Sequence, residues 1–316
     1  MLSKKVSTKI IRGILTYIPY ADFSRGESTG GTNSAKYCYE VWIKHLSIAF
    51  NNGLKKIPDV IAELGPGDSL GIGLAGLLSG ASKYYALDVV NYAYVKRNLE
   101  IFEELIELIT NKTPNPSIGF PNYDCYLDEN YFPSDILTNE LLQKSLKPKR
   151  INTIRKIIKG EKTGNTEMEI RYFCPWLNDS VIKENSVDFI YSQSVFEHIN
   201  DLSSTYKALY KWLKTGGITS HQIDLKCHGL FNKWNGHWSI GDFLWKMIQG
   251  KRPYLLLNRK PFTSYRDLFI KNNFDITVEK RYINSNGIKR SELKGLFRNL
   301  STSEFETSGY FIQAKK

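Results

Sequence analysis

The stretch from residue 60 to residue 90 constrains the fold more than any other part of this chain. An apolar run that ends in Glu63 is followed by the turn Gly65-Pro66-Gly67 and by small and apolar residues over Ile72–Ser79. A second apolar run ends at Asp88. This order predicts a strand, a tight turn, a helix and a second strand that ends in an acid, as at the start of a doubly wound α/β sheet.

Each part of this stretch suits the binding of an adenosine-containing ligand. Gly65 and Gly67 tolerate a positive φ, so a ligand can approach the backbone closely, and the start of the following helix offers free N–H groups. Asp88 can accept hydrogen bonds from two ribose hydroxyls. The pattern fits a dinucleotide or S-adenosylmethionine, and an ordinary turn with glycines for packing is the alternative. Glu63 would repel a pyrophosphate, whereas it suits the ammonium group of a methionyl end.

The composition is that of a globular protein with an excess of positive charge. Of its 316 residues, 41% are hydrophobic and 24% charged, and 43 basic against 32 acidic residues give a net charge of +11. That charge favours anionic partners, such as a phosphate-bearing substrate, and leaves room for peripheral contact with a membrane. DNA is not an expected partner, because the chain lacks dense Lys/Arg runs and zinc-finger spacings. No apolar segment reaches about 18 residues, so no transmembrane segment is expected.

The cysteines indicate a reducing compartment. They are scattered, and no two form a C-x-x-C pair (Cys38, Cys125, Cys174 and Cys227). This pattern predicts free thiols in a cytoplasmic protein, and it favours neither a disulfide framework nor a zinc site.

Strands and helices alternate along most of the chain. The alternation predicts an α/β fold with a doubly wound, mostly parallel seven-stranded sheet, closed by a late pair of strands. Residues 1–56 are expected to form an N-terminal helical extension, or cap, and residues 57–316 the main domain. Insertions are expected in this domain at about 111–165 and 225–260. The second follows a strand, where a lid over an active site is often found.

The region after the fourth expected strand carries the resemblance to a known family. Ser192 is followed by Phe196-Glu197-His198 and, after a helix, by Leu213-Lys214-Thr215-Gly216-Gly217. With the glycine turn, these motifs resemble the class I S-adenosylmethionine-dependent methyltransferases from Val60 to Asp224, outside the insertion. Thr215 stands where proline is usual. The resemblance implies a Rossmann-like fold, S-adenosylmethionine as the cofactor and methyl transfer as the reaction.

A narrower resemblance concerns the acceptor. The stretches GGTNSAKYCYEVWIKHL and ELGPGDSLGIGLAGLLSG are similar to methyltransferases linked to the synthesis of bacterial surface glycans. This similarity implies O-methylation of a sugar, or of another small hydroxylated substrate, on a nucleotide-linked or lipid-linked carrier.

The resemblance also implies a set of cofactor contacts. Glu63 and the glycine turn would line the methionyl portion, Asp88 would hold the ribose, and Trp176 would stack on adenine, because no acid follows the third strand before Asp179. Ser192 and Gln193 would lie near the transferred methyl group. The expected cofactor-binding residues are Glu63, Gly65, Pro66, Gly67, Asp88, Val89, Trp176, Ser192 and Gln193.

A hydroxyl acceptor needs a base, and histidine is the obvious candidate. His221, oriented by Asp224, leads, followed by His228 and His198. A metal is not expected, because a group of His221, Asp224 and His228 supplies too few oxygen ligands for Mg²⁺ or Mn²⁺. The expected substrate contacts are Tyr39, Trp234, His237 and Arg259; for the last three, the core of a small hydrophobic subdomain is the alternative.

Two other functions compete with this prediction. An RNA or protein methyltransferase is the first, and the sequence Ser192-Gln193-Ser194-Val195 argues against it, because it replaces the Asn-Pro-Pro-Tyr type of motif that serves amino methylation. The second is a scaffold that binds the cofactor without catalysis. The intact glycines and both acids, Glu63 and Asp88, argue against a scaffold.

Overall fold

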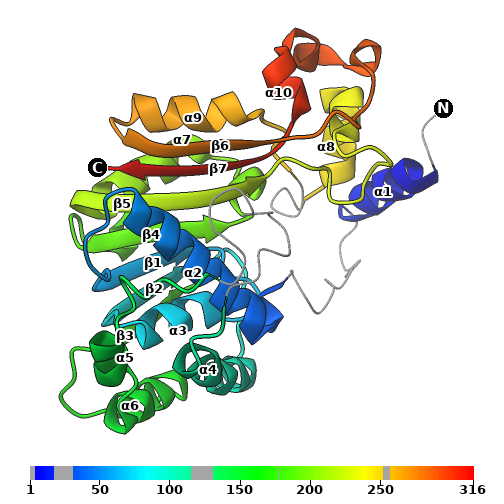
Figure 1. Cartoon of the computed structure of the whole chain (residues 1–316). Helices are drawn as coiled ribbons and strands as arrows, with labels where there is room; N and C mark the ends of the chain where they lie inside the picture. The colour runs from blue at the N-terminus through cyan, green and yellow to red at the C-terminus, as the bar shows by residue number, and fades with distance from the viewer. Residues whose placement is uncertain (1–3, 18–30, 115–130, 177, 252–256) are drawn as a thin grey trace. The chain divides into compact units, whose positions relative to one another are not determined.

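A computed structural model describes residues 4–17, 31–114, 131–176, 178–251 and 257–316 (Figure 1). The first expected insertion therefore lies partly outside the described residues, as does Cys125. The other three cysteines, Cys38, Cys174 and Cys227, are free thiols, as predicted.

Seven strands form one sheet with the order β3-β2-β1-β4-β5-β7-β6 (Figure 1). Neighbouring strands among β1 to β4 run parallel, so the predicted fold class is confirmed. The strands are β1 (Val60–Leu64), β2 (Lys83–Leu87), β3 (Glu169–Phe173), β4 (Val187–Gln193), β5 (Leu213–Asp224), β6 (Asp275–Ile283) and β7 (Thr307–Lys315).

Strand β7 runs against its neighbours. The Gly216 amide of β5 bonds to the carbonyl of Lys316, whereas Leu225, after the far end of β5, bonds to Ser308. Residue numbers therefore rise along β5 as they fall along β7, which is an antiparallel register. This is the closing strand that the sequence predicts. The two glycines expected to end the helix before β5 lie inside this strand instead, because the helix already ends at Trp212.

The chain divides into two compact units. The first unit comprises 26–193, 207–220 and 313–316, and the second comprises 1–25, 194–206 and 221–312. The segment 1–56 is thus divided between them. The helices of the first unit are α2 (Ala35–Asn51), α3 (Gly71–Leu78), α4 (Val95–Thr110), α5 (Asn139–Ser145) and α6 (Pro148–Ile158). Those of the second unit are α1 (Lys4–Leu15), α8 (Asp242–Gln249), α9 (Phe262–Lys271) and α10 (Thr302–Glu306). Helix α7 (Leu202–Trp212) has residues in both units.

Close packing in the first unit explains some of the glycines that follow β1. Helices α2, α3 and α4 pack against one another (Figure 1). A Cβ added to Gly71 would lie 2.5 Å from the sulfur of Cys38, and one added to Gly73 would lie 2.1 Å from the ring of Tyr84. These two glycines therefore serve packing, which is the alternative that the sequence left open for this stretch.

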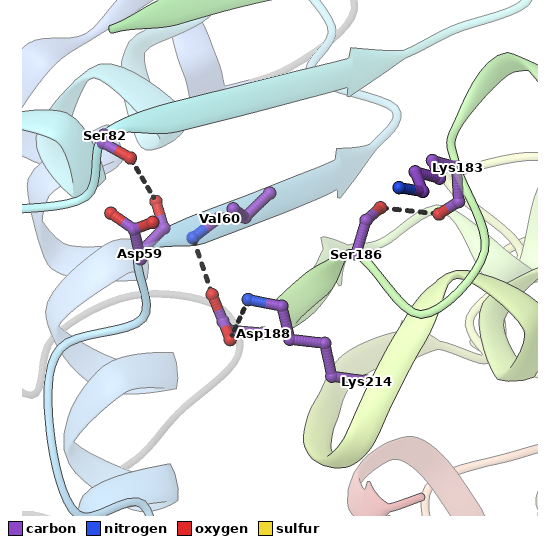
Figure 2. A network of polar contacts seen from close by, with 7 residues as sticks. All are labelled: Asp59, Val60, Ser82, Lys183, Ser186, Asp188 and Lys214. Carbon is purple, nitrogen blue, oxygen red and sulfur yellow. Dashed lines mark hydrogen bonds and ion pairs between the residues drawn. The ribbon is translucent and has the colours of Figure 1, made fainter. Parts of the chain in front are cut away.

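Polar contacts connect the amino ends of neighbouring strands in the sheet (Figure 2). The carboxylate of Asp188 on β4 accepts a hydrogen bond from the Val60 amide of β1 at 2.8 Å and pairs with Lys214 of β5 at 2.7 Å. Beside them, the hydroxyl of Ser82 donates to the carbonyl of Asp59. The network holds the amino ends of β1, β4 and β5 in register. The carboxyl ends of these strands are therefore the ones left for a ligand.

In the second unit, α1 packs against α8 (Figure 1). The approach is close at Gly13, where an added Cβ would lie 1.9 Å from the carbonyl oxygen of Met247. Ile10 packs on the hydrophobic cluster that contains Trp245 and Ile248. Among the helices that the structure describes, none combines the length and the apolar character that crossing a bilayer requires.

Candidate active site

The strand order places a topological switch point at the carboxyl ends of β1 and β4. Strand β1 lies between β2 and β4, so the connections on its two sides diverge there, and ligands of doubly wound sheets bind at such switch points. The register pairs Leu64 of β1 with Leu87 of β2 and with Ser192 of β4. The glycine turn, Asp88 and Gln193 follow these three residues directly. The structure therefore brings together residues that the sequence assigned to one site.

The glycine turn has the predicted conformation. Gly65 has a φ of 65° and Gly67 a φ of 70°, in the left-handed region that side chains disfavour. The Gly65 amide donates to the carbonyl of Leu87 at 2.8 Å, which binds the turn to the end of β2. Both glycines are half-buried, and Pro66 between them is buried. A ligand can thus reach the backbone of the turn at the two glycines.

Asp88 lies beside this turn. Its carboxylate accepts hydrogen bonds from the amides of Gly67 at 3.4 Å and of Val89 at 2.7 Å. Its carbonyl accepts one from the amide of Trp176 at 3.0 Å. The ring of Trp176 is partly exposed and makes an edge contact with Trp212, with 5.6 Å between the ring centroids. Asp88, Val89 and Trp176 are therefore neighbours, as expected for the adenosine end of a site.

The amides at the start of α3 are not free, which corrects one expectation. The Asp68 amide donates to the hydroxyl of Thr32 at 2.9 Å, and the Leu70 amide to the side-chain oxygen of Asn98 at 2.9 Å. The Gly71 amide donates to the hydroxyl of Ser69 at 3.1 Å. These side chains hold the turn in shape from within the protein. Sequence reasoning missed Thr32 and Asn98, because they lie far from the turn along the chain.

Glu63 lies inside the core and already has hydrogen-bond partners there, so its carboxyl is not an open ligand for an ammonium group. It is 1% exposed and accepts hydrogen bonds from the hydroxyls of Tyr84 at 2.5 Å and Tyr191 at 3.2 Å. Burial raises the pKa of this carboxyl to about 8. This raised pKa favours the protonated carboxyl, so the charge of Glu63 is a weaker reason to expect a cation there than the sequence alone suggests. Its contact with the methionyl portion stays a prediction.

A buried histidine positions Gln193 at the end of β4. His45 of α2 lies between the hydroxyl of Ser220, 2.6 Å from its Nδ1, and the side-chain oxygen of Gln193, 3.2 Å from its Nε2. Gln313 of β7 donates to the same Ser220 hydroxyl at 2.9 Å. Burial lowers the pKa of His45 to about 4. His45 is thus a neutral side chain that connects α2, β4, β5 and β7.

This burial predicts a loss of stability in mild acid. The pKa of His45 falls from an ordinary value of 6.5 to about 4 in the folded protein, so the unfolded chain binds a proton between these pH values and the folded chain does not. Stability therefore decreases as the pH falls through that window, by about 2 kcal/mol at pH 5. Urea unfolding of the wild type and of His45→Gln at pH 7 and pH 5 should show a smaller decrease in the variant. Equal decreases would contradict this assignment.

The second unit holds a cluster of acids and histidines, here called the acid–histidine cluster: Glu197, His198, Asp224 and His228. Asp224 Oδ2 lies 3.3 Å from His228 Nε2, and the rings of His198 and His228 have centroids 5.2 Å apart. Glu197 is buried and accepts a hydrogen bond from the Asp224 amide at 3.3 Å. Burial, with the Asp224 charge, raises the pKa of Glu197 well above its usual range.

Asn258 holds this cluster in place, and sequence reasoning missed it. Its side-chain amide donates to the carbonyls of Phe196 at 2.8 Å and of Ile199 at 2.9 Å, and its backbone amide donates to the carbonyl of Glu197 at 2.6 Å. Tyr265 donates to the Asn258 side-chain oxygen at 2.8 Å. These bonds shape the short turn that carries Glu197 and His198. No local pattern marks Asn258, since its partners lie some sixty residues earlier.

His221 is not oriented by Asp224, which corrects the leading prediction for the base. The ring of His221 is fully buried against Phe196, with 4.2 Å between centroids, and against Phe269. Successive side chains of a strand point to opposite faces, so residues three apart on β5 cannot share one. Asp224 therefore faces His228, the second candidate, and His221 belongs to an aromatic core.

The four expected substrate contacts all have partners within the protein, and their contact with a substrate stays a prediction. Tyr39 is 1% exposed, and its hydroxyl donates to the Thr113 carbonyl at 2.5 Å. His237 is buried beside Trp238, and burial lowers its pKa to about 3. Trp234 is half-buried and donates to the carbonyl of Asn284 at 3.2 Å. The alternative of a small hydrophobic subdomain thus describes this region better than a sugar-binding surface.

Arg259 is the polar centre of that subdomain. It is 6% exposed and donates to the carbonyls of His237 at 3.2 Å and Ile240 at 3.0 Å, and it pairs with Asp242. Its guanidinium lies 4.8 Å from the ring centroids of both Trp245 and Phe297. These partners hold the guanidinium within the subdomain, and its contact with a substrate stays a prediction.

The described residues fit the cofactor that the sequence implies. The left-handed turn at Gly65 and Gly67 leaves backbone accessible beside the carboxylate of Asp88, at the edge where a doubly wound sheet binds its ligand. The turn and the carboxylate lie next to the end of β4, where the resemblance places the transferred methyl group.

Comparison with known proteins identifies a methyltransferase domain in part of the chain. Residues 137–220 match the family described as "Methyltransferase domain". That range contains β3, β4, α7 and the start of β5, and it leaves out the glycine turn. The chain is an enzyme of the S-adenosylmethionine-dependent methyltransferase class. Its cofactor is S-adenosylmethionine.

Solved structures that resemble the chain are distant. Phosphoethanolamine N-methyltransferase 2 from Haemonchus contortus is 11% identical, with a TM-score of 0.42, over 96% of this chain and 60% of that one. An S-adenosylmethionine-dependent methyltransferase from Mesorhizobium loti is 12% identical, with a TM-score of 0.39, over 90% and 100%. One from Methanosarcina mazei is 15% identical, with a TM-score of 0.38, over 85% and 96%. A comparison with curated proteins found no significant sequence match.

Proposed function

We propose that the protein O-methylates a hydroxyl group of a sugar, or of another small hydroxylated substrate, in the synthesis of a surface glycan. The observation that supports an oxygen acceptor is the acid–histidine cluster, above all the Asp224–His228 pair at 3.3 Å. A hydroxyl has a high pKa and must lose its proton during methyl transfer, whereas a neutral amine can attack without a base.

The reaction is a displacement at the carbon of a methyl group that the sulfonium of the cofactor activates. The acceptor oxygen forms the new C–O bond as the C–S bond breaks, which leaves a methyl ether and S-adenosylhomocysteine. Asp88, the glycine turn and Gln193 hold and orient the reactants. The hydroxyl proton needs an acceptor, and a histidine whose ring is oriented by a carboxylate, as His228 is by Asp224 in the second unit, is a base of the required kind.

Transfer of labelled methyl groups from S-adenosylmethionine tests this function. We expect label in nucleotide-linked or lipid-linked sugars when the enzyme is given fractionated extracts, and none in RNA or protein. Label that accumulates in RNA, with retention that weakens as salt rises, would support the competing RNA methyltransferase instead. Cofactor binding without transfer to any fraction would support a scaffold.

The role of the cluster has its own test. His228→Ala should lower turnover by about 100-fold to 10,000-fold, because a positioned base contributes about that much, and should leave the affinity for S-adenosylhomocysteine unchanged. His221→Phe is the matched control: its ring already lies between Phe196 and Phe269, so we expect turnover close to that of the wild type. The reverse result, with only His221→Phe inactive, would restore the base predicted from the sequence.

A further inference from the structure

The acid–histidine cluster has the geometry of a metal site. Glu197, His198 and His228 each present one ligand-type atom, a carboxylate oxygen or a ring nitrogen, and these atoms all lie within 4.8 Å of one another. Two ligands that bind one ion at about 2.1 Å and at a tetrahedral angle lie about 3.4 Å apart. His228 has a side chain that is 36% exposed, so a small rotation of its ring can close the remaining distance.

The buried carboxyl of Glu197 points independently to a ligand. Glu197 is 1% exposed, and its Oε2 is buried without a hydrogen bond. Its Oε1 accepts one long bond, from the amide of Asp224 at 3.3 Å. A buried oxygen without a partner destabilises a protein by about 1–3 kcal/mol. A cation bound at this oxygen would give it the missing partner.

Further contacts hold the ligand side chains of the cluster in place. Asp224 Oδ2 lies 3.3 Å from His228 Nε2, in the manner of a carboxylate that orients a metal-binding histidine. Asn258 bonds to the carbonyls of Phe196 and Glu197 and so fixes the turn from which two of the ligands project. Asp224 and Asn258 therefore position the three ligand side chains without being among them.

We propose that Glu197, His198 and His228 bind a divalent transition-metal ion, with Asp224 as the carboxylate that orients His228. Two imidazoles and one carboxylate suit Zn²⁺, Co²⁺ or Fe²⁺, whereas Mg²⁺ and Ca²⁺ prefer oxygen ligands. The sequence led to the opposite expectation, because it grouped His221 with Asp224 and His228 and left Glu197 out.

An ion here has a chemical consequence for the acceptor. A divalent cation lowers the pKa of a hydroxyl that approaches it, so that the hydroxyl gives up its proton more easily. This consequence rests on the proposed function. The binding of the ion does not, because it depends on the four side chains of the second unit alone.

Titration with Co²⁺ tests the site, because its visible absorption reports the ligands directly. We expect one Co²⁺ to bind each untagged, chelator-treated chain, with an absorption that Zn²⁺ abolishes and Mg²⁺ does not. Asp224→Asn should weaken Co²⁺ binding by about 10-fold to 100-fold, and Glu197→Gln and His228→Ala by at least as much. The matched control is Glu184→Gln, an exposed carboxylate outside the cluster, which should bind as the wild type does.

Two results would overturn the proposal. One is no Co²⁺ absorption at millimolar metal, and the other is binding of equal strength in the wild type and all three cluster variants. Circular dichroism and S-adenosylhomocysteine affinity, measured on every variant, separate loss of the site from loss of the fold. If Co²⁺ binds as expected while labelled methyl transfer to sugars fails, the metal site stands and the proposed function falls.

Discussion

Asp88→Ala should lose affinity for S-adenosylhomocysteine by about 100-fold or more, measured by calorimetry. A carboxylate that accepts two ribose hydroxyls contributes two charge-assisted hydrogen bonds, each worth about 1.5–3 kcal/mol. The same side chain also accepts from the amides of Gly67 and Val89, so its removal loosens the turn that the ligand contacts. Both effects act in the same direction.

Two further variants separate these effects. Asp88→Asn keeps an oxygen for the backbone amides and loses the charge, so its affinity should fall between those of the wild type and Asp88→Ala. Asp59→Ala removes an exposed acid at the opposite edge of the same sheet and should bind as the wild type does. Unchanged affinity in Asp88→Ala, with the fold intact by circular dichroism, would remove Asp88 from the cofactor site.

Arg259→Ala should lower the free energy of unfolding by about 3 kcal/mol. The variant loses hydrogen bonds to the carbonyls of His237 and Ile240 and the contacts of the guanidinium with Trp245 and Phe297. Each buried hydrogen bond contributes about 1 kcal/mol, and each cation–π contact about 0.5–2 kcal/mol. Arg259→Lys should recover part of the loss, since an ammonium lacks the planar fork that reaches both carbonyls.

Asp242→Ala is the matched control for this prediction. Asp242 pairs with Arg259, but its side chain is 68% exposed, so its removal should cost less than about 1 kcal/mol. Urea unfolding of the three variants measures the order of the effects. If Arg259→Ala kept its full stability and lost only turnover, Arg259 would have the substrate-binding role that the sequence suggested.

Much of the fold could be predicted from local patterns. Helix α2 lies within the segment 1–56 that the sequence predicts to be helical, and β1 and β2 occupy the two apolar runs around the glycine turn. Gly65 and Gly67 adopt positive φ because only glycine does so without strain. The position of Asp88 directly after β2 was predicted in the same way. Each of these features depends on residues close together in the sequence.

The partners of the candidate site residues could not be predicted in this way. His228 and not His221 faces Asp224, because the direction of each side chain on β5 depends on which face of the strand is buried. The sequence suggests a substrate contact at Arg259, whereas the tertiary structure surrounds its side chain with carbonyls and rings.

The sequence by itself therefore determined the class of fold and the place of the turn, since these follow from glycine conformation and the spacing of apolar residues, whereas the cofactor followed from the resemblance to a known family. Only the tertiary structure decided which side chains meet. Thr32, Asn98 and Asn258 bond to residues 28 or more positions away, and such contacts depend on how the elements pack. Packing is a property of the whole chain, and no local pattern encodes it.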